Sequence, residues 1–310
     1  MLKNRKSGIL LHISSLPGKY GIGDLGKQAY HFVDRLEEIG QVYWQILPTN
    51  EPNCSNSPYD TSSAFAQNPM LISLEQLLLD GFLEESDFKG SAVLNSSKID
   101  FNHLKKWKSP LLLKAAKTFQ KRFSEKQNHD FENFCKINET WLDSYAAYKV
   151  LKNKNNDLPW FEWDDNLKSY NEIMIKSSLK NDREKVEIIK IIQYFFNKQW
   201  QLLKNYANNK NILLIGDLPI YISHDSADVW ANQKLFKLND DGNMVVKSGC
   251  PPDYFMEEGQ VWGHPIYNWE SHAKENYKWW ISRLSFLTTG VDLVRFDHFN
   301  GILKYWEIPN

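Results

Sequence analysis

A carboxylate and a guanidinium group stand two residues apart near the end of the chain, in the run Val294-Arg295-Phe296-Asp297-His298-Phe299. The apolar residues before them predict a strand, and in a strand Arg295 and Asp297 point to the same side. An arginine beside a carboxylate favours its ionised form and fixes its orientation. A carboxylate nucleophile needs both, because it must be ionised when it attacks. The spacing therefore makes Asp297 the candidate nucleophile.

A second carboxylate, Asp217, follows another apolar run, Leu213-Leu214-Ile215-Gly216. Taken alone, either aspartate has an alternative interpretation, since an aspartate at a strand end is commonly a helix N-cap or a turn former. His298, directly after Asp297, can donate a hydrogen bond to a substrate hydroxyl, although a single histidine is more often structural. Together the two aspartates stand where a barrel would place them at its active-site face.

Four short apolar runs bounded by turn residues predict the strands that position these groups: residues 8–13, 42–47, 212–218 and 291–296. Apolar residues at helical spacing predict helices over 28–39, 186–206 and 275–287. A strand–helix–strand order favours a parallel sheet. Each strand is followed by a long polar segment, including loops over about 50–69 and 219–269. This pattern predicts an α/β fold, a TIM barrel whose chemistry lies at the C-terminal strand ends.

Four strands supply only about the first half of such a barrel, and we expect the chain to divide into three parts. Residues 1–70 hold the first two strands and a substrate loop. Residues 71–185 are mostly helical in pattern, with connections rich in Lys and Asn, and predict an inserted helical subdomain. Residues 186–310 hold the third and fourth strands with another long loop. The second barrel half is expected to be absent.

Composition excludes several classes of protein. Of 310 residues, 42% are apolar and 24% charged, with a formal net charge of −1, so neither a nucleic-acid nor a membrane-surface partner is expected. Three distant cysteines argue against a disulfide framework or a zinc site. A basic, polar start followed by an apolar run of only 9–13 predicts no signal peptide, and we expect a cytoplasmic protein. Twelve tryptophans indicate either a large aromatic core or rings that stack on sugars.

The run Gly21-Ile22-Gly23-Asp24-Leu25-Gly26 has the glycine spacing of a dinucleotide-binding turn. Its context argues against that function. The first predicted strand does not run straight into Gly21, and the second ends in Leu47-Pro48-Thr49, with no acidic residue to hold a ribose.

Motifs spread over residues 7–309 together resemble the 4-alpha-glucanotransferase (amylomaltase) family, glycoside hydrolase family 77. They are Ser7 to His12 with Ser14 to Pro17, Gly21 to Gly26, Trp44 to Pro48, Ser57-Pro58-Tyr59, Ser63 to Pro69, Gly216 to Tyr221, Pro251 to Phe255, Gly259 to Gly263, and Arg295 to Phe299.

The resemblance implies a retaining transfer of an α-1,4-glucan segment to the 4-hydroxyl of an acceptor glucan, as in the metabolism of maltodextrin, starch or glycogen. Asp297 would be the nucleophile, and Asp217 and His298 resemble residues that hold hydroxyls of the sugar at the cleavage site. Tyr59, Asp253 and Trp262 resemble donor or acceptor contacts, and Arg295 belongs to the same substrate-binding set. No metal or organic cofactor is implied, because the chemistry is carboxylate chemistry.

The chain departs from the family pattern in three places. Residues 49–56, which include Glu51, Pro52 and Cys54, replace a glycine-bearing loop, and Asn300 stands where arginine is usual. The family's acid/base glutamate and third carboxylate would lie beyond Asn310, and Glu307 comes too soon after the fourth strand to serve. We therefore expect an incomplete, inactive fragment of a transferase. The alternatives are a non-catalytic α-glucan-binding protein and a degraded reading frame.

Overall fold

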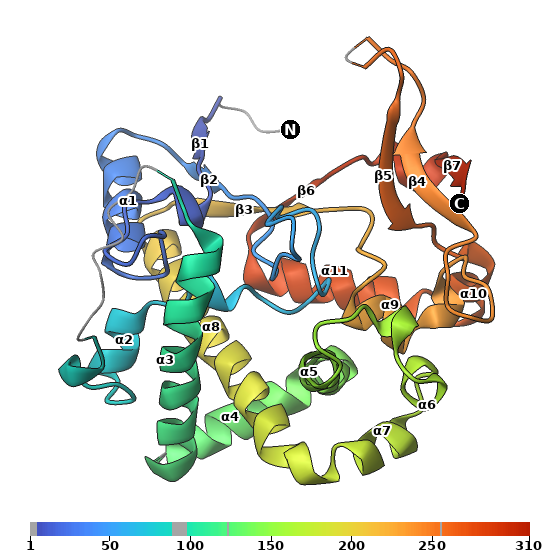
Figure 1. Cartoon of the computed structure of the whole chain (residues 1–310). Helices are drawn as coiled ribbons and strands as arrows, with labels where there is room; N and C mark the ends of the chain where they lie inside the picture. The colour runs from blue at the N-terminus through green and yellow to red at the C-terminus, as the bar shows by residue number, and fades with distance from the viewer. Residues whose placement is uncertain (1–4, 89–97, 123, 255) are drawn as a thin grey trace.

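The computed structural model describes residues 5–88, 98–122, 124–254 and 256–310, and it has an α/β fold built on a parallel sheet (Figure 1). The sheet contains β1 (Gly8–Leu10), β2 (Tyr43–Gln45), β3 (Leu213–Leu218) and β6 (Leu293–Phe296) in the order β1-β2-β3-β6. Every neighbouring pair is parallel. The four predicted strands and their parallel arrangement are thus confirmed, although each strand is shorter than its apolar run.

Helices cover one face of this sheet, below and beside the strands in Figure 1. They are α1 (Lys27–Glu38), α8 (Arg183–Asn209) and α11 (Lys278–Gly290). Apolar residues at helical spacing put Ala29, Val33 and Leu36 of α1 on its buried side. Trp44 of β2 and Leu214 of β3 point to this face, share a register position, and are fully buried.

The opposite face of the sheet is open. Leu10 of β1 and Leu293 of β6, which lie in register with Gln45 and Ile215, are 54% and 43% exposed. Because side chains alternate along a strand, Asp217 and Arg295 also point to this open face. The covered face therefore carries the core, and the open face carries the strand-end polar groups.

The predicted helix over residues 275–287 begins three residues later than expected. Asn276 and Tyr277 both have φ of 55°, in the left-handed region, so the helix starts only after them. The helix predicted over 186–206 extends at both ends, to Arg183–Asn209.

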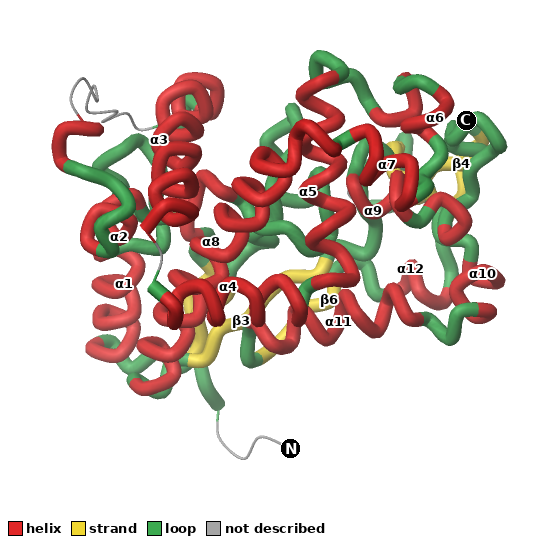
Figure 2. The backbone as a smooth tube through the Cα atoms, turned by 90° about the horizontal axis from the view of Figure 1, so that it is seen from below, coloured by secondary structure: helices red, strands yellow, loops and turns green. Residues whose placement is uncertain are grey.

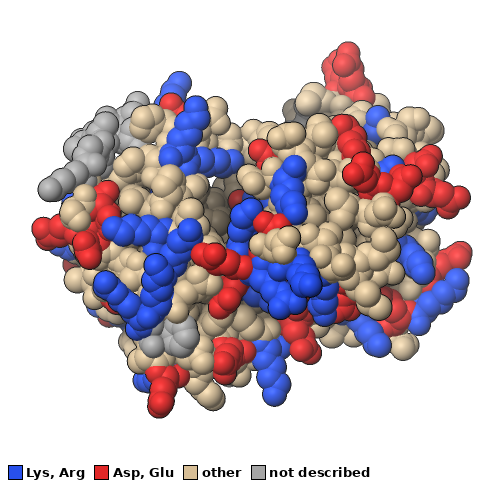
Figure 3. Space-filling view, turned by 60° about the horizontal axis from the view of Figure 1, so that its bottom comes forward, with Lys and Arg blue, Asp and Glu red and all other residues tan. Residues whose placement is uncertain are grey.

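Further helices lie between β2 and β3 in the chain: α2 (Leu74–Leu79), α3 (Phe101–Arg122), α4 (Glu125–Ile137), α5 (Glu139–Lys154), α6 (Asp165–Lys168) and α7 (Glu172–Ser178). Of these, α3, α4 and α5 pack against α8, and α2 packs against α3 (Figure 2). Lys and Arg side chains are interspersed with Asp and Glu over this side of the molecule (Figure 3). No helix in the described part of the chain has the length and apolar character needed to cross a membrane. The division of the chain into three parts stays a prediction.

A small antiparallel sheet corrects the expectation of a loop over residues 219–269. β4 (Val246–Cys250) pairs with β5 (Gln260–Pro265) and with β7 (Trp306–Pro309), and short helices α9 (Ala227–Ala231) and α10 (Trp269–Lys274) flank the hairpin. β4 and β5 contain glycine, proline and polar residues without apolar alternation, so the sequence carries no strand signal there. Pairing between distant segments decides their structure, and the hairpin projects from the body (Figure 1).

Candidate functional site

The carboxyl ends of β3 and β6 bring Asp217, Arg295 and Asp297 together. Arg295 donates from Nη1 to both carboxylate oxygens of Asp217, at 2.7 and 2.8 Å, and from Nη2 to Asp297 Oδ1 at 2.6 Å. The Asp217 side chain is fully buried, whereas that of Asp297 is 35% exposed. One guanidinium thus bridges a buried carboxylate and an accessible one, which is the orientation expected for Arg295.

Tyr59 reaches the same cluster from a loop. Its hydroxyl donates to Asp217 Oδ2 at 2.6 Å. Burial raises the pKa of Asp217, although Tyr59 and Arg295 offset part of this rise. Burial, together with the hydrogen bond to Asp217, raises the pKa of Tyr59 to about 12. Tyr59 is therefore protonated at neutral pH and donates a hydrogen bond to Asp217.

His298 lies directly beyond the nucleophile candidate in a restrained conformation. Its φ of 47° is in the left-handed region, which a residue with a side chain rarely adopts. Its ring meets Trp262 edge to face, with 4.8 Å between the ring centroids. A Cβ added at Gly301 would lie 2.9 Å from His298 Cδ2, so this glycine allows the close approach. The structure therefore places Trp262 against His298, the residue that follows Asp297.

Asp253 is the predicted site residue that the structure leaves outside this cluster. It is exposed in the connection between β4 and β5, where its carboxylate accepts from the backbone N–H of Met256 at 2.8 Å. That connection stands away from the ends of β3 and β6 in Figure 1.

Two carboxylates that hold the Tyr59 loop were not predicted as site residues. Glu51 accepts hydrogen bonds from Tyr145 Oη at 2.7 Å, Lys149 Nζ at 2.9 Å and Ser62 Oγ at 3.0 Å. Burial raises the pKa of Glu51, but these partners outweigh it, so the pKa lies below its ordinary value. Asp60 likewise binds three donors. The only sequence signal was an acidic residue at each end of a polar loop.

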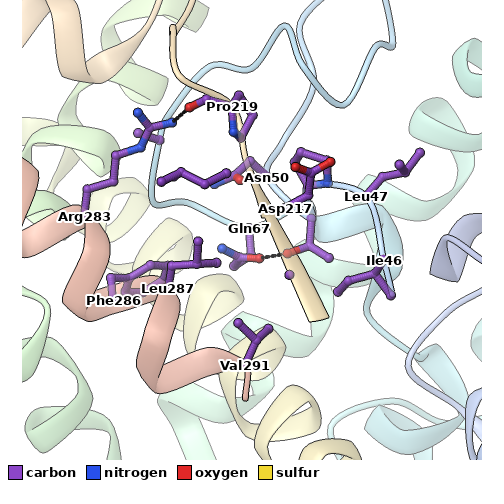
Figure 4. Close-up of a pocket in the computed structure, with 15 residues that line it drawn as sticks. Ile46, Leu47, Asn50, Gln67, Asp217, Pro219, Arg283, Phe286, Leu287 and Val291 are labelled. Atoms are coloured by element: carbon purple, nitrogen blue, oxygen red, sulfur yellow. Dashed lines mark hydrogen bonds between the residues drawn. The ribbon is translucent and has the colours of Figure 1, made fainter. Parts of the chain in front are cut away.

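A small cavity of about 30 Å³ lies behind Asp217, between the ends of β2 and β3 and α11 (Figure 4). Arg283 of α11, which is 2% exposed, donates to the Pro219 carbonyl at 2.6 Å and so fixes the connection after β3. On the other side, a larger hollow of about 470 Å³ is lined by residues of β4, α12 (Asn300–Leu303) and β7, with His298 and Asn300 on its wall. The site is therefore closely packed on the side of α11 and accessible on the side of His298 and Asn300.

No group of three His, Cys, Asp or Glu side chains within 5–88, 98–122, 124–254 and 256–310 is arranged to hold a metal ion. The cluster offers carboxylate, guanidinium, phenol and imidazole groups. Such an arrangement can orient a hydroxylated ligand and present one accessible carboxylate to it.

A family model described as 4-alpha-glucanotransferase matches residues 11–310. The 4-alpha-glucanotransferase of Streptococcus pneumoniae serotype 4 is 44% identical over 310 residues, which are 99% of this chain and 61% of that protein. That of Aquifex aeolicus is 42% identical, over 98% of this chain and 61% of its own length. The chain thus spans about 61% of the length of these curated relatives.

Two solved structures of amylomaltases are also similar to this chain. An amylomaltase from Streptococcus agalactiae in complex with acarbose superposes with a TM-score of 0.93 and 39% identity, over 99% of this chain and 62% of that one. An amylomaltase from Corynebacterium glutamicum superposes with a TM-score of 0.82 at 18% identity, over 98% and 42% of the two chains. The second likeness is one of fold.

Proposed function

The chain belongs to the 4-alpha-glucanotransferase family, and from this premise we propose that its cluster of Asp217, Arg295 and Asp297 is the nucleophile side of a glucan-transfer site. The observation that carries the proposal is the guanidinium of Arg295, which bridges a buried and an accessible carboxylate. A retaining glycosyl transfer needs one carboxylate that is ionised, oriented and open to the anomeric carbon. Asp297 is oriented by Arg295 and open to a ligand, whereas the Asp217 side chain is fully buried.

In the proposed reaction an Asp297 oxygen attacks the anomeric carbon of an α-1,4-linked glucose unit. A bond forms between that oxygen and C1 as the bond to the leaving sugar breaks. The 4-hydroxyl of an acceptor glucan then attacks C1 and releases Asp297. Each displacement inverts C1, so the new bond has the same α configuration as the bond that was broken. The leaving sugar needs a proton from an acid, and the acceptor hydroxyl loses one to a base. We assign that acid/base role to no residue of 1–310.

The other cluster members are proposed to bind the sugar. The Asp217 carboxylate and the His298 ring are proposed to hold its hydroxyls, with Tyr59 and Arg295 keeping Asp217 in place. The exposed part of Trp262 is proposed as an apolar wall, since aromatic rings beside an open hollow suit a sugar face. Asp253 is proposed as a donor or acceptor contact on the resemblance alone.

The proposed partners are α-1,4-glucans: maltodextrins and segments of starch or glycogen. The parallel sheet is proposed to be part of a TIM barrel, with residues 71–185 as a helical subdomain inserted between its second and third strands. In TIM-barrel enzymes the active site lies at the C-terminal ends of the strands. No metal is required for the proposed step.

A donor that leaves without a proton tests the nucleophile alone. With α-glucosyl fluoride, the C1–F bond breaks as the bond to Asp297 forms, and fluoride departs. We expect intact-mass analysis to find one added glucosyl group, and peptide mapping to locate it on Asp297. Asp297→Asn removes the nucleophilic charge at constant shape and should give no adduct. Asp87→Asn, far from the cluster, is the control and should label normally. An unlabelled parent chain, or an adduct elsewhere, would overturn the proposal.

A further inference from the structure

Tyr59 reaches Asp217 from a loop, so its position depends on what holds that loop. Two antiparallel bridges, Asn50↔Gln67 and Pro52↔Thr61, close the base of the loop. Beyond them the chain turns back through a tip at residues 53–60 that carries Tyr59. The Pro52↔Thr61 bridge lies only two residues from Tyr59, so it fixes the backbone there, but it does not fix the direction of the Tyr59 side chain.

The carboxylate of Asp60, the residue next to Tyr59, ties this tip together. It accepts from Asn53 Nδ2 at 3.0 Å and from Ser55 Oγ at 2.8 Å, both within the tip. It also accepts from Ser223 Oγ, on the connection that follows β3. Burial raises the pKa of Asp60, but these three hydrogen bonds outweigh it and hold the pKa below its ordinary value. The carboxylate is therefore ionised and fully engaged at neutral pH.

The Asp60–Ser223 hydrogen bond matters because of where Ser223 lies. Asp217 is in β3 (Leu213–Leu218), and Ser223 lies on the connection that follows this strand. Arg283 fixes the start of that connection by donating to the Pro219 carbonyl. Neighbouring residues of the tip thus contact the same stretch of chain twice, Tyr59 through Asp217 and Asp60 through Ser223. A single contact would fix only the distance between the loop tip and this stretch of chain. Two adjacent contacts also prevent the tip from rotating against it.

We propose that Asp60 is a positioning residue, whose carboxylate fixes the loop tip so that the Tyr59 hydroxyl meets Asp217. Asp60 acts on the site only through Tyr59, and its importance for glucan transfer rests on the proposed function. Glu51, bound to Tyr145 and Lys149 of α5, holds the base of the same loop. Loss of Asp60 should therefore release the tip while the base stays anchored.

Substitutions at Asp60 should have graded effects. Asp60→Ala removes the acceptor for all three donors. Asp60→Asn keeps the shape, and the serine hydroxyls can turn to accept from its amide, since a hydroxyl both donates and accepts. The asparagine should therefore restore most of what alanine loses. Ser223→Ala removes only the contact to the β3 connection and gives a milder variant that tests the same idea.

Fluorine NMR of the chain labelled with fluorotyrosine reads the Tyr59 hydrogen bond without any turnover. The Tyr59 signal is assigned by its loss in Tyr59→Phe, and Asp217→Asn shows where the signal moves when its acceptor changes. We expect Asp60→Ala to move the signal toward the position of free fluorotyrosine, Ser223→Ala to move it partway, and Asp60→Asn to leave it near the parent position. Asp87→Ala, a carboxylate on η3 (Glu85–Phe88) that binds Lys114, is the control and should not move it.

An unmoved Tyr59 signal in folded Asp60→Ala or Ser223→Ala would overturn the proposal. If the alanine variant does not fold, Ser223→Ala decides. The readout is independent of glucosyl labelling, so a chain that forms no adduct on Asp297 can still show the dependence of Tyr59 on Asp60, and failure of one proposal is distinguishable from failure of the other.

Discussion

Arg295 lies in β6 and Asp297 directly follows the strand, and Arg295 Nη2 donates to Asp297 Oδ1 at 2.6 Å. The other end of the same guanidinium is occupied by the buried Asp217. The same guanidinium group therefore orients Asp297 and compensates the negative charge of Asp217. A change at Arg295 should affect both labelling and stability.

We expect Arg295→Met to lower the free energy of unfolding by about 1–3 kcal/mol, because within the described residues Asp217 then keeps only Tyr59 as a side-chain donor. The value is at the lower end for a buried pair, since the Arg295 side chain is 43% exposed and partly screened. Urea unfolding at pH 7 measures it. Arg35→Met, which breaks an exposed pair with Glu38 on α1, is the matched control and should change little. Equal effects of the two substitutions would contradict the role of Arg295.

Labelling of Asp297 by α-glucosyl fluoride should also slow in Arg295→Met, by about 10- to 1000-fold, because an oriented group facing developing charge contributes at this scale. The measurement is the rate at which the glucosyl adduct appears by intact mass. Arg295→Lys keeps the charge but cannot bind both carboxylates in the planar manner of a guanidinium, so it should recover only part of the rate. Full recovery by lysine would show that charge alone is needed.

The anchor at the loop base should contribute to stability. Lys149→Met leaves Glu51, whose side chain is 16% exposed, with Tyr145 and Ser62 as donors. We expect a loss of about 1–2 kcal/mol in urea unfolding at pH 7. The loss should shrink in acid: the pKa of Glu51 is lowered in the folded chain, so the pair stabilises above the ordinary glutamate pKa and less as pH falls through it. Lys176→Met, in an exposed pair with Glu172, is the comparison.

Stability should fall in mild acid because of His12. Burial lowers the pKa of His12 from 6.5 to about 4, and its Nδ1 is buried without a hydrogen-bond partner. Between these values the unfolded chain binds the proton and the folded chain does not, so the free energy of unfolding decreases as pH falls from 6.5 toward 4. The decrease from this group is at most about 3 kcal/mol.

Urea titrations at pH 7 and pH 5 check this dependence. His12→Gln cannot take up the proton and should flatten the decrease, whereas His31→Gln, on the exposed side of α1, should not. A parent chain with the same pH dependence as His12→Gln would rule out this group as the cause.

The strands and the pair at the end of β6 were predictable because their signals are local. Apolar runs between turn residues marked β1, β2, β3 and β6, and alternation put Arg295 and Asp297 on one side. Tyr59 and Trp262 came only from the resemblance, since nothing local links them to Asp217 or His298. β4, β5 and β7 were missed because pairing between distant segments forms them. Asp60 and Glu51 were missed because their partners, Ser223 and Lys149, lie far away in the sequence.

The open and covered faces of the sheet bear on how the sequence can vary. Trp44 and Leu214, on the covered face, are fully buried among α1, α8 and the strands, so almost any replacement leaves a cavity or a clash. Leu10 and Leu293, on the open face, have no such constraint from the helices. Away from the Asp217–Arg295 pair, saturation mutagenesis read out by folding should therefore alternate between intolerant and tolerant positions along each strand. Selection for chemistry can therefore change the residues on the open face, while selection for folding keeps the alternate residues on the covered face unchanged.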